Sequence, residues 1–474
     1  MNNPEEHHNF ERDESFRDSI GTIAEDGKRN WLFPQKPKGN LYNKRTIASI
    51  VYLVLFFSIP FIKINGDPLV LLNIVERKFI IFGIVFFPQD LFLFAVAMLT
   101  FMVFIVLFTA IFGRLFCGWA CPQTIFMEMV FRKIEYWIDG DANAQRKLKA
   151  APWSREKIFK RASKHFIFFA ISFLIANFFL AYIIGMDELI KIAVEPISQH
   201  TGGFIAIMSF TGAFFFVYSW FREQVCLVVC PYGRLQGVLL DKNSIVVAYD
   251  YVRGEPRGKH KKGQEESSLG DCIDCGLCVR VCPTGIDIRN GTQLECVNCT
   301  ACIDACDGIM DQVKKPRGLI RYDSENGIAI GQKLKITTRM IGYSLVLVAL
   351  VTGLGFGIGS RSSSEVTILR APGQLFQEVG TDSISNLYNF KIVNKSRGEL
   401  PVSIVIENLP ASIKSIGSGI NNITLKRDGL AEGTFFVIIH RKDLEGRKNK
   451  LEFKVLSGDK ELETYSSTFL APVK

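Results

Sequence analysis

The sequence predicts a chain of mixed fold class in three parts: an α-helical membrane domain of five spans, a small cysteine-rich domain in the cytoplasm and a C-terminal β-sandwich. Three observations lead to this division. Five long stretches are almost free of charge, eight of the twelve cysteines fall between residues 272 and 306, and the C-terminal part alternates apolar and polar residues. A chain of 474 residues is long enough for several domains.

Five apolar stretches are long enough, or nearly so, to cross a bilayer as helices. About 20 residues without charges are needed to span the hydrocarbon region, and hydrophobic residues form 48% of this chain, with 39 phenylalanines. A polar and charged segment precedes the first stretch and is too long for a cleaved secretory signal, so that stretch is predicted to be a retained span. The predicted spans are 46–62, 91–112, 166–184, 203–221 and 340–358.

The basic residues of the connecting segments predict the orientation in the membrane. Lys and Arg number eight in residues 1–45, two in 65–89, eleven in 113–164 and one in 186–202. Because positive loops stay in the cytoplasm, the N-terminus and residues 222–339 are predicted to be cytoplasmic and the C-terminus to lie outside. The net charge of +9 follows from this bias. No base-reading motif is present, so nucleic acid is not an expected partner.

The domain boundaries follow from these spans and from the C-terminal pattern. Runs such as "LPVSIVIENLP" and "KLEFKVLSGDKEL" alternate apolar and polar residues between turn residues, which is typical of an antiparallel β-sandwich. The predicted parts are a cytoplasmic N-terminal segment (1–45), four spans with two cysteine motifs (46–252), the cysteine-rich domain (253–335), the fifth span (336–359) and the sandwich (366–474).

Two runs of four cysteines each have the spacing C-x2-C-x2-C-x3-C. This spacing is typical of bacterial ferredoxins with two 4Fe-4S clusters, in which the fourth cysteine of each run binds the other cluster. Three thiolates two residues apart can surround three corners of a cubane, and the fourth must come from a distant backbone segment. We therefore assign Cys272, Cys275, Cys278 and Cys306 to cluster one, and Cys296, Cys299, Cys302 and Cys282 to cluster two.

A pair of structural zinc sites is the alternative for these cysteines, because C-x2-C pairs also bind zinc. Zinc would take two such pairs for each ion and would leave the third evenly spaced cysteine of each run without a use. All twelve cysteines lie in predicted cytoplasmic segments or at cytoplasmic helix ends, where thiols stay reduced and structural disulfides are not expected. Two 4Fe-4S clusters are therefore the predicted cofactors.

The other four cysteines form two copies of the motif C-x3-C-P, each at the cytoplasmic end of a span: "FCGWACPQTIF" and "VCLVVCPYGRLQ". Proline is favoured at the first position of a helix, so each motif is predicted to open a new helix. The dipole of that helix favours thiolate at the preceding cysteine, and Arg114, Arg222 and Arg234 are predicted to act in the same direction. The four candidate residues are Cys117, Cys121, Cys226 and Cys230.

The two motifs form one site if the two pairs of spans pack together. Four thiolates at the cytoplasmic membrane surface suit Cu(I), zinc or another iron–sulfur cluster, and a redox-active dithiol also fits the pattern. The structural alternative is four inert buried cysteines, since free cysteine often packs as a small hydrophobe. The repetition of one motif at two matching points favours a functional site.

Other ionisable residues give weaker signals. Glu128 and Glu135 lie on the helix predicted after the first motif, and we interpret them as part of a solvated face, with proton transfer as the alternative. His260 in the charged linker is interpreted as solvated, and His7 and His8 lie in a tail that is predicted to be disordered. None of them is a candidate site residue.

Several stretches together resemble the cytochrome c oxidase accessory protein family known as FixG or CcoG. They include "RNWLFPQKPKGN", "GRLFCGWACPQT", "CLVVCPYGRLQGVLLDK", the stretch of eight cysteines and "RGLIRYDSENG", so the resemblance covers nearly the whole chain. The resemblance implies a membrane-bound polyferredoxin of the bacterial cytoplasmic (inner) membrane with an immunoglobulin-like domain in the periplasm. It also implies assistance in assembling the cbb3-type cytochrome c oxidase, by reduction of Cu(II) to Cu(I) before copper insertion.

The resemblance therefore predicts an oxidoreductase, a cupric reductase, with copper held near Cys117, Cys121, Cys226 and Cys230. An unidentified cytoplasmic donor is expected to supply the electrons. The expected partners are the membrane and either oxidase assembly factors or copper chaperones. Two alternatives stay open: a quinol-linked electron-transfer subunit of a membrane redox system, and a passive assembly scaffold whose clusters are structural.

Overall fold

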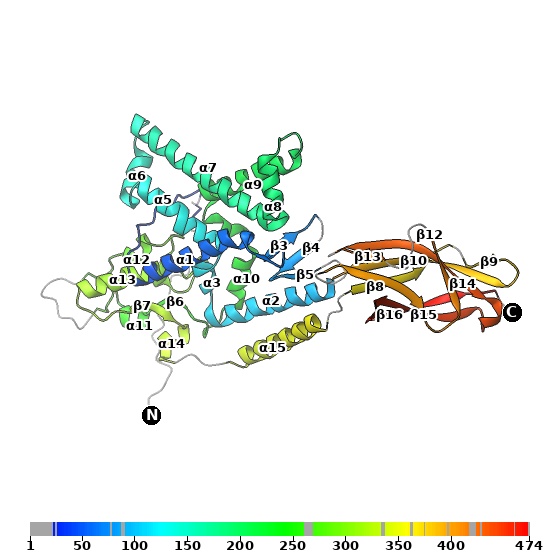
Figure 1. Cartoon of the computed structure of the whole chain (residues 1–474). Helices are drawn as coiled ribbons and strands as arrows, with labels where there is room; N and C mark the ends of the chain where they lie inside the picture. The colour runs from blue at the N-terminus through cyan, green and yellow to red at the C-terminus, as the bar shows by residue number, and fades with distance from the viewer. Residues whose placement is uncertain are drawn as a thin grey trace, which may run out of the picture. The chain divides into compact units, whose positions relative to one another are not determined.

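The structure is a computed structural model that divides into two compact units, Met1–Thr352 and Gly353–Lys474 (Figure 1). The histidines at positions 7, 8 and 260 lie outside the described residues. The residues that the structure describes are 22–23, 26–75, 78–86, 91–259, 269–332, 337–360, 364–373, 375–395, 398–416, 423–426, 429–458 and 460–472.

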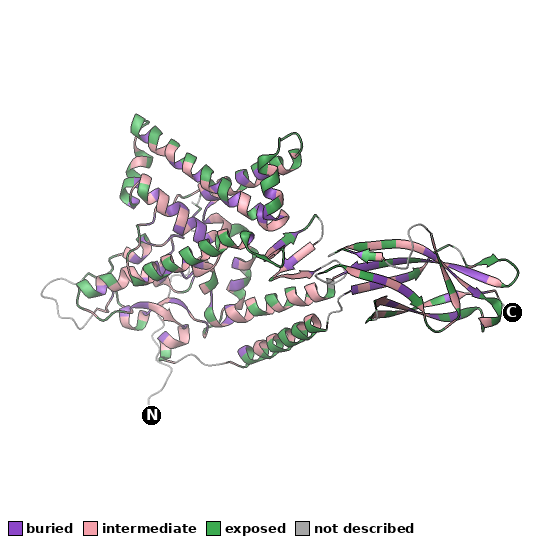
Figure 2. Cartoon of the chain, in the orientation of Figure 1, coloured by how far each residue is buried: buried purple, intermediate pink, exposed green. Residues whose placement is uncertain are grey.

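Five helices in the described part of the chain are long and apolar enough to cross a membrane, which confirms the predicted number of spans. Little of their surface is buried by the protein itself, and none of the apolar window of the fifth helix is buried (Figure 2). Such surface is suited to contact with lipid. The helices are α1 (Asn40–Ser58), α2 (Leu91–Phe112), α7 (Arg155–Ile184), α9 (Thr201–Phe216) and α15 (Thr338–Gly359), with α1 and α9 continued by η2 (Ile59–Phe61) and η5 (Val217–Phe221).

The third membrane helix, α7, begins well before the predicted residue 166. Ser154 caps its N-terminus by accepting a hydrogen bond from the backbone amide of Lys157. The first turns carry charged residues, so they continue the helix beyond its apolar part. Apolarity alone predicts the membrane-crossing part of such a helix but not where the hydrogen-bonded helix begins.

Residues between the first two spans form small antiparallel sheets that the sequence analysis did not predict. The hairpin of β1 (Lys63–Ile64) and β2 (Asp67–Pro68) precedes a sheet in the order β3–β4–β5. The middle strand of that sheet buries Ile80 completely, and Leu71 of the first strand and Phe86 of the third are also buried. Its strands are β3 (Val70–Asn73), β4 (Lys78–Ile81) and β5 (Ile84–Phe86).

Short helices follow the apolar spans and carry the cysteine motifs. After α2 come α3 (Leu115–Trp119), α4 (Pro122–Thr124), the π-helix η4 (Ile125–Phe131), α5 (Arg132–Ile138) and α6 (Ala142–Ala150). Helix α8 (Met186–Val194) precedes α9, and the π-helix η6 (Val225–Val229) and α10 (Pro231–Leu239) follow it.

The cysteine-rich domain is closed by an antiparallel pair of strands, β6 (Val246–Tyr249) and β7 (Ile320–Asp323). Strand β6 lies before residue 253, where the sequence analysis placed the start of this domain. The buried core includes Val247, Tyr249, Met310, Leu319 and Ile320 together with the cysteines. The helices of this domain are α11 (Tyr251–Gly254), α12 (Leu277–Arg280), η8 (Ile288–Asn290), α13 (Ala301–Gln312) and α14 (Glu325–Ile330).

The C-terminal unit contains two antiparallel sheets with a shared apolar core, as predicted. Buried Tyr388 donates its hydroxyl to the carbonyl of Thr468 at 2.9 Å and so joins the two sheets. One sheet contains β12 (Ala411–Ile416), β14 (Leu430–His440), β10 (Ser383–Asn394), β8 (Ser364–Arg370) and β9 (Gln377–Val379). The other contains β13 (Ile423–Leu425), β11 (Leu400–Ile406), β15 (Lys448–Ser457) and β16 (Lys460–Leu470), with η9 (Arg441–Asp443) between β14 and β15.

Candidate metal centres

One cavity of the cysteine-rich domain is lined by four thiols from two segments. Three belong to the first cysteine run, at and before α12, and the fourth comes from α13. The cavity encloses about 370 Å³, and its other walls include Tyr249 and Arg289. The four thiols are those of Cys272, Cys275, Cys278 and Cys306.

A second cavity, of about 350 Å³, is lined by the remaining thiols of the two runs. Its four cysteines are Cys282, Cys296, Cys299 and Cys302, and Cys278 of the first set also reaches its wall. In each cavity, therefore, the fourth cysteine comes from the other run. The two cavities share a wall, which places the two thiol sets side by side.

The two runs have the same backbone conformation around their second cysteine. Asp274 and Asn298 precede that cysteine with φ of 51° and 53°, and Gly276 and Thr300 follow it with φ of 65° and 66°. This left-handed region is accessible to Gly, Asn and Asp but is unusual for a β-branched residue. Thr300 is held there partly by a hydrogen bond from its hydroxyl to the carbonyl of Cys299, at 2.6 Å.

The thiol sets fit polynuclear clusters better than single ions. No group of three or more His, Cys, Asp or Glu side chains among the described residues is gathered closely enough to hold one metal ion. Four thiols spread around a cavity of this size suit a cubane instead. Burial raises the pKa of Cys278, Cys296 and Cys306 to about 12. Because metals bind thiolates, loading of either cavity would release protons.

The C-x3-C-P cysteines lie at the starts of new helices, as predicted. Cys117 lies in α3, and Cys121 is the residue before α4, which Pro122 opens. In the second motif, Cys226 lies in η6 and Cys230 precedes α10, which also begins with proline. The π-helices η4, η5 and η6 lie in the same region. Such π-helical turns are frequent at functional sites.

The four C-x3-C-P thiols lie within electrostatic reach of one another. Burial, together with the neighbouring thiols of Cys121, Cys117 and Cys230, raises the pKa of Cys226 to about 12. Burial likewise raises the pKa of Cys117 to about 11, against the effect of nearby Arg114. The structure therefore brings the two motifs together.

The first motif packs directly against the loop of the second cavity. Cys117 joins an apolar cluster with Val297 and Cys299. At Gly118, an added Cβ would lie 2.5 Å from the carbonyl oxygen of Val297 and 2.7 Å from that of Asn298. Only a residue without a side chain allows this approach. The C-x3-C-P site and the second thiol cavity are therefore in van der Waals contact.

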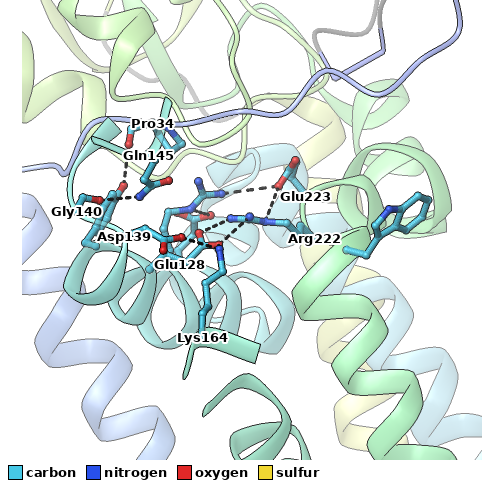
Figure 3. A network of polar contacts seen from close by, with 12 residues as sticks. Pro34, Glu128, Asp139, Gly140, Gln145, Lys164, Arg222 and Glu223 are labelled. Carbon is cyan, nitrogen blue, oxygen red and sulfur yellow. Dashed lines mark hydrogen bonds and ion pairs between the residues drawn. The ribbon is translucent and has the colours of Figure 1, made fainter. Parts of the chain in front are cut away.

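A buried network of charges lies beside the two motifs (Figure 3). Arg222 donates two hydrogen bonds to Glu135, at 3.0 and 2.6 Å, and Lys164 of α7 donates to Asp139 at 2.7 Å. In Figure 3, Lys164 of α7 and Arg222, which follows η5, reach the network from different parts of the chain. Further ion pairs join Glu128 to Arg132 (2.9 Å), Arg132 to Glu223 (3.8 Å) and Arg29 to Glu223 (3.0 Å).

Three family models match this chain, and both cysteine motifs fall within models of iron–sulfur domains. A 4Fe-4S binding domain matches residues 94–141, a 4Fe-4S dicluster domain matches residues 221–325, and the Ig-like fold at the C-terminus of FixG matches residues 354–472. The nitrogen fixation protein FixG of Rhizobium meliloti is 33% identical over 430 residues, which cover 81% of this chain and 80% of that protein. The chain belongs to the FixG family.

Two proteins of Cereibacter sphaeroides extend this comparison of the FixG-family chain. RdxA is 34% identical over 78% of this chain and 80% of its own length, and RdxB is 31% identical over 82% and 86%. With its five apolar helices and its two 4Fe-4S binding domains, this FixG homologue is a membrane iron–sulfur electron-transfer protein.

One prediction about charged residues in this FixG-family chain is wrong. Glu128 and Glu135 do not form a solvated face, because their side chains are 13% and 4% exposed and are paired with arginines. The interpretation failed because other parts of the protein cover these carboxylates. The guanidinium of Arg222 bonds to Glu135, and its effect on the thiols stays a prediction, while the side chain of Arg234 lies outside the described residues.

The sequence analysis of the FixG-family chain missed Gln236, which is fully buried beside the C-x3-C-P site. Its Oε1 accepts hydrogen bonds from Cys117 Sγ at 3.2 Å and from Arg114 Nε at 2.8 Å. The sequence shows Gln236 only as a polar residue on the helix that follows the second motif. Its burial becomes evident only when the packing of the two motifs is known.

Proposed function

We propose that this FixG-family chain reduces Cu(II) to Cu(I) and so assists assembly of a cbb3-type cytochrome c oxidase. One observation carries the proposal: four C-x3-C-P thiols lie together, in contact with the loop of the second thiol cavity. An electron that reaches this cavity has only a short path to a metal held by these thiols.

The cysteine-rich domain supplies the electron path in this proposal. The thiols of Cys272, Cys275, Cys278 and Cys306 hold cluster one, and those of Cys282, Cys296, Cys299 and Cys302 hold cluster two. Clusters bound in this way accept and deliver single electrons. The shared wall at Cys278 supports transfer between them, and exposed Cys275 places cluster one nearest to an external cytoplasmic reductant.

Copper is the substrate in this proposal. Among the described residues the C-x3-C-P thiols are not gathered closely enough to hold one metal ion, so Cys117, Cys121, Cys226 and Cys230 would move closer together when they bind it. A cluster held by the second thiol set would supply the one electron that converts Cu(II) to Cu(I), and the external reductant would replace that electron. Thiolates favour Cu(I), so the ligand set itself supports the reduction. The carboxylates nearest to the site are paired with arginines and are not free to compete for the ion.

The proposal includes an orientation of the protein in the membrane. The excess of basic residues supports cytoplasmic placement of the N-terminus, of the C-x3-C-P motifs and of both clusters. With five spans, the β-sandwich lies in the periplasm of a bacterial inner membrane, where it can contact oxidase assembly factors or copper chaperones. Reporter fusions at the two termini would test this topology.

The fourfold serine variant of Cys117, Cys121, Cys226 and Cys230 tests the function. The purified, dithionite-reduced protein is mixed with stoichiometric Cu(II), and Cu(I) is measured with a chelator while EPR follows the clusters. We expect wild-type protein to form Cu(I) as its reduced-cluster signal disappears, and the variant to keep its clusters but form none. His200→Ala, at an outer-loop histidine paired with Glu195, controls for adventitious copper binding and should behave as wild type.

Other outcomes of this experiment separate the alternative functions. Unchanged copper reduction in the fourfold variant would exclude these thiols as the copper site. Clusters that stay reduced in the presence of copper but are oxidised by a quinone would identify a quinol-linked electron-transfer subunit. A scaffold role would be indicated if cluster-ligand variants that still fold also retained oxidase assembly.

A further inference from the structure

An arginine precedes each C-x3-C-P motif and crosses to the helix that follows the other motif. Arg114 precedes Cys117 and bonds to α10 of the second motif. Arg222 precedes Cys226 and bonds to α5 after the first motif. Each of these arginines is only 5% exposed. The exchange ties the two motifs to each other through buried side chains.

The contacts of Arg114 join the C-x3-C-P site to the second thiol cavity. Its Nη1 donates to the carbonyl of Cys296, a residue of that cavity, at 3.3 Å, and its Nη2 donates to the carbonyl of Gly233. Its Nε donates to Gln236 Oε1, which also accepts from Cys117 Sγ. One guanidinium therefore contacts the backbone of the second thiol set and, through one shared acceptor, a thiol of the C-x3-C-P site.

The charges of the two arginines are balanced differently. Arg222 has a bidentate carboxylate partner in Glu135. All the acceptors of Arg114 are neutral, and within the described ranges of the chain it forms no ion pair with a carboxylate. A buried charge without a counter-charge is costly, so an anion is expected close by.

Thiolates on either side of Arg114 supply that anion once metal is bound. Arg114 shares the acceptor Gln236 with Cys117 Sγ and donates to the backbone carbonyl of Cys296. We propose that Arg114 is a counter-cation shared by cluster two and the C-x3-C-P site, and that it favours the reduced form of cluster two. This inference rests on the cluster assignment of the proposed function and adds a positioning residue to it.

The physical consequence is a change in reduction potential. Reduction adds one negative charge to a cluster, and a fixed positive charge nearby stabilises the product, so the potential rises. Arg114 bonds to Cys296 of the second thiol set, so cluster one is expected to respond less. Arg114 would therefore make cluster two the better electron acceptor of the pair, next to the copper site.

The test is an EPR-monitored redox titration of the full-length protein with both clusters in detergent. Arg114→Gln removes the charge, Arg114→Lys keeps it, and Gln236→Glu places a carboxylate against Arg114. The Cys306→Ser protein identifies the titration step of cluster one. Arg146→Gln, at an exposed arginine of α6, is the matched control for the loss of one positive charge.

We expect Arg114→Gln and Gln236→Glu to lower the potential of cluster two, whereas Arg114→Lys and Arg146→Gln stay near wild type. If Arg114→Gln fails to assemble cluster two while Arg114→Lys assembles it, the charge is required, as proposed. An unchanged cluster two potential in either charge-altering variant overturns the proposal, as does loss of cluster two in Arg114→Lys as well. Wild-type protein that does not reduce copper refutes the proposed function alone, because the potentials are measured without copper.

Discussion

Asp304 on α13 accepts hydrogen bonds from the backbone amides of Leu41 and Tyr42, in the first turn of the first membrane helix, at 3.1 and 2.7 Å. Asp304 lies between two cysteines of different cavities, Cys302 and Cys306. Its carboxylate satisfies amides that have no partner within the helix and meets the positive end of the helix dipole. The cluster domain is thereby joined to a transmembrane helix through one side chain.

Asp304→Ala should lower the free energy of unfolding by about 1 kcal/mol, the usual effect of losing an N-terminal helix cap. The expected result is a lower midpoint of thermal unfolding, measured by circular dichroism in detergent, with faster cluster loss. Asp311→Ala on the same helix is the control, because Asp311 pairs with Arg317 at the exposed surface. Equal effects of the two substitutions would show that the cap contributes nothing specific.

Gly118→Ala should prevent close contact between the first C-x3-C-P motif and the loop of cluster two. The new methyl group would meet two backbone carbonyls at less than 3.0 Å, and backbone cannot move aside cheaply. We expect loss of cluster two, measured as iron content and visible absorbance. Gly308→Ala on α13 meets no atom within 4 Å and should be neutral or slightly stabilising. Full iron content in Gly118→Ala would contradict the observed packing.

Each thiol cavity takes its fourth cysteine from the other run. Substitution of the fourth cysteine of each run should therefore affect the cluster bound mainly by the other run. Cys282→Ser should alter the EPR signal of cluster two although Cys282 belongs to the first run, and Cys306→Ser should alter that of cluster one. The measurement is EPR of the reduced proteins together with iron content. If Cys282→Ser altered the same cluster as Cys272→Ser, the assignment would be wrong.

Glu135→Gln should give a stability deficit that depends on pH. Burial by itself raises the pKa of Glu135, but Arg222, Lys164 and Arg132 outweigh it, so the folded-state pKa lies below the ordinary value of 4.5. The carboxylate therefore stabilises the fold above the ordinary value, and this contribution is lost as the pH falls through the folded-state pKa. Removing one member of a buried pair costs about 3–5 kcal/mol at neutral pH.

Thermal unfolding of Glu135→Gln, followed by circular dichroism at neutral pH and at about pH 3, checks this prediction. The deficit relative to wild type should be large at neutral pH and smaller in acid, because the contribution of the Glu135 carboxylate declines as the pH falls toward its lowered folded-state pKa. Glu156→Gln, at an exposed pair with Lys160 on α7, should change stability little at either pH. A deficit of the same size at both pH values would contradict an ionised Glu135.

The cysteine spacing and the apolar stretches predicted most of the architecture, because each reflects a strong physical constraint. Spans need long uncharged segments, and cubane ligands need short, regular spacing. The strands between the first two spans were missed because Val70–Asn73 and Lys78–Ile81 are short, as are the turns between them. The early start of α7 was missed because a capping serine, not apolarity, determines it.

The candidate site was predictable in its ligands but not in its surroundings. The repeated motif identified Cys117 and Cys226 without any structure. The roles of Arg114 and Gln236 depend on which helices cross, and no local pattern in the sequence contains that information. The buried state of Glu135 was missed for the same reason, since its partners come from α7 and from the segment after α9.

The pairing of β6 with β7 has a consequence for biosynthesis. Strand β6 follows the fourth span, and β7 is completed only at Asp323, shortly before the fifth span begins. The cluster domain can close only after β7 has been synthesised, when the four spans that precede it have already been made. Iron and sulfide must therefore be delivered to a nascent or newly released chain that is already anchored in the membrane.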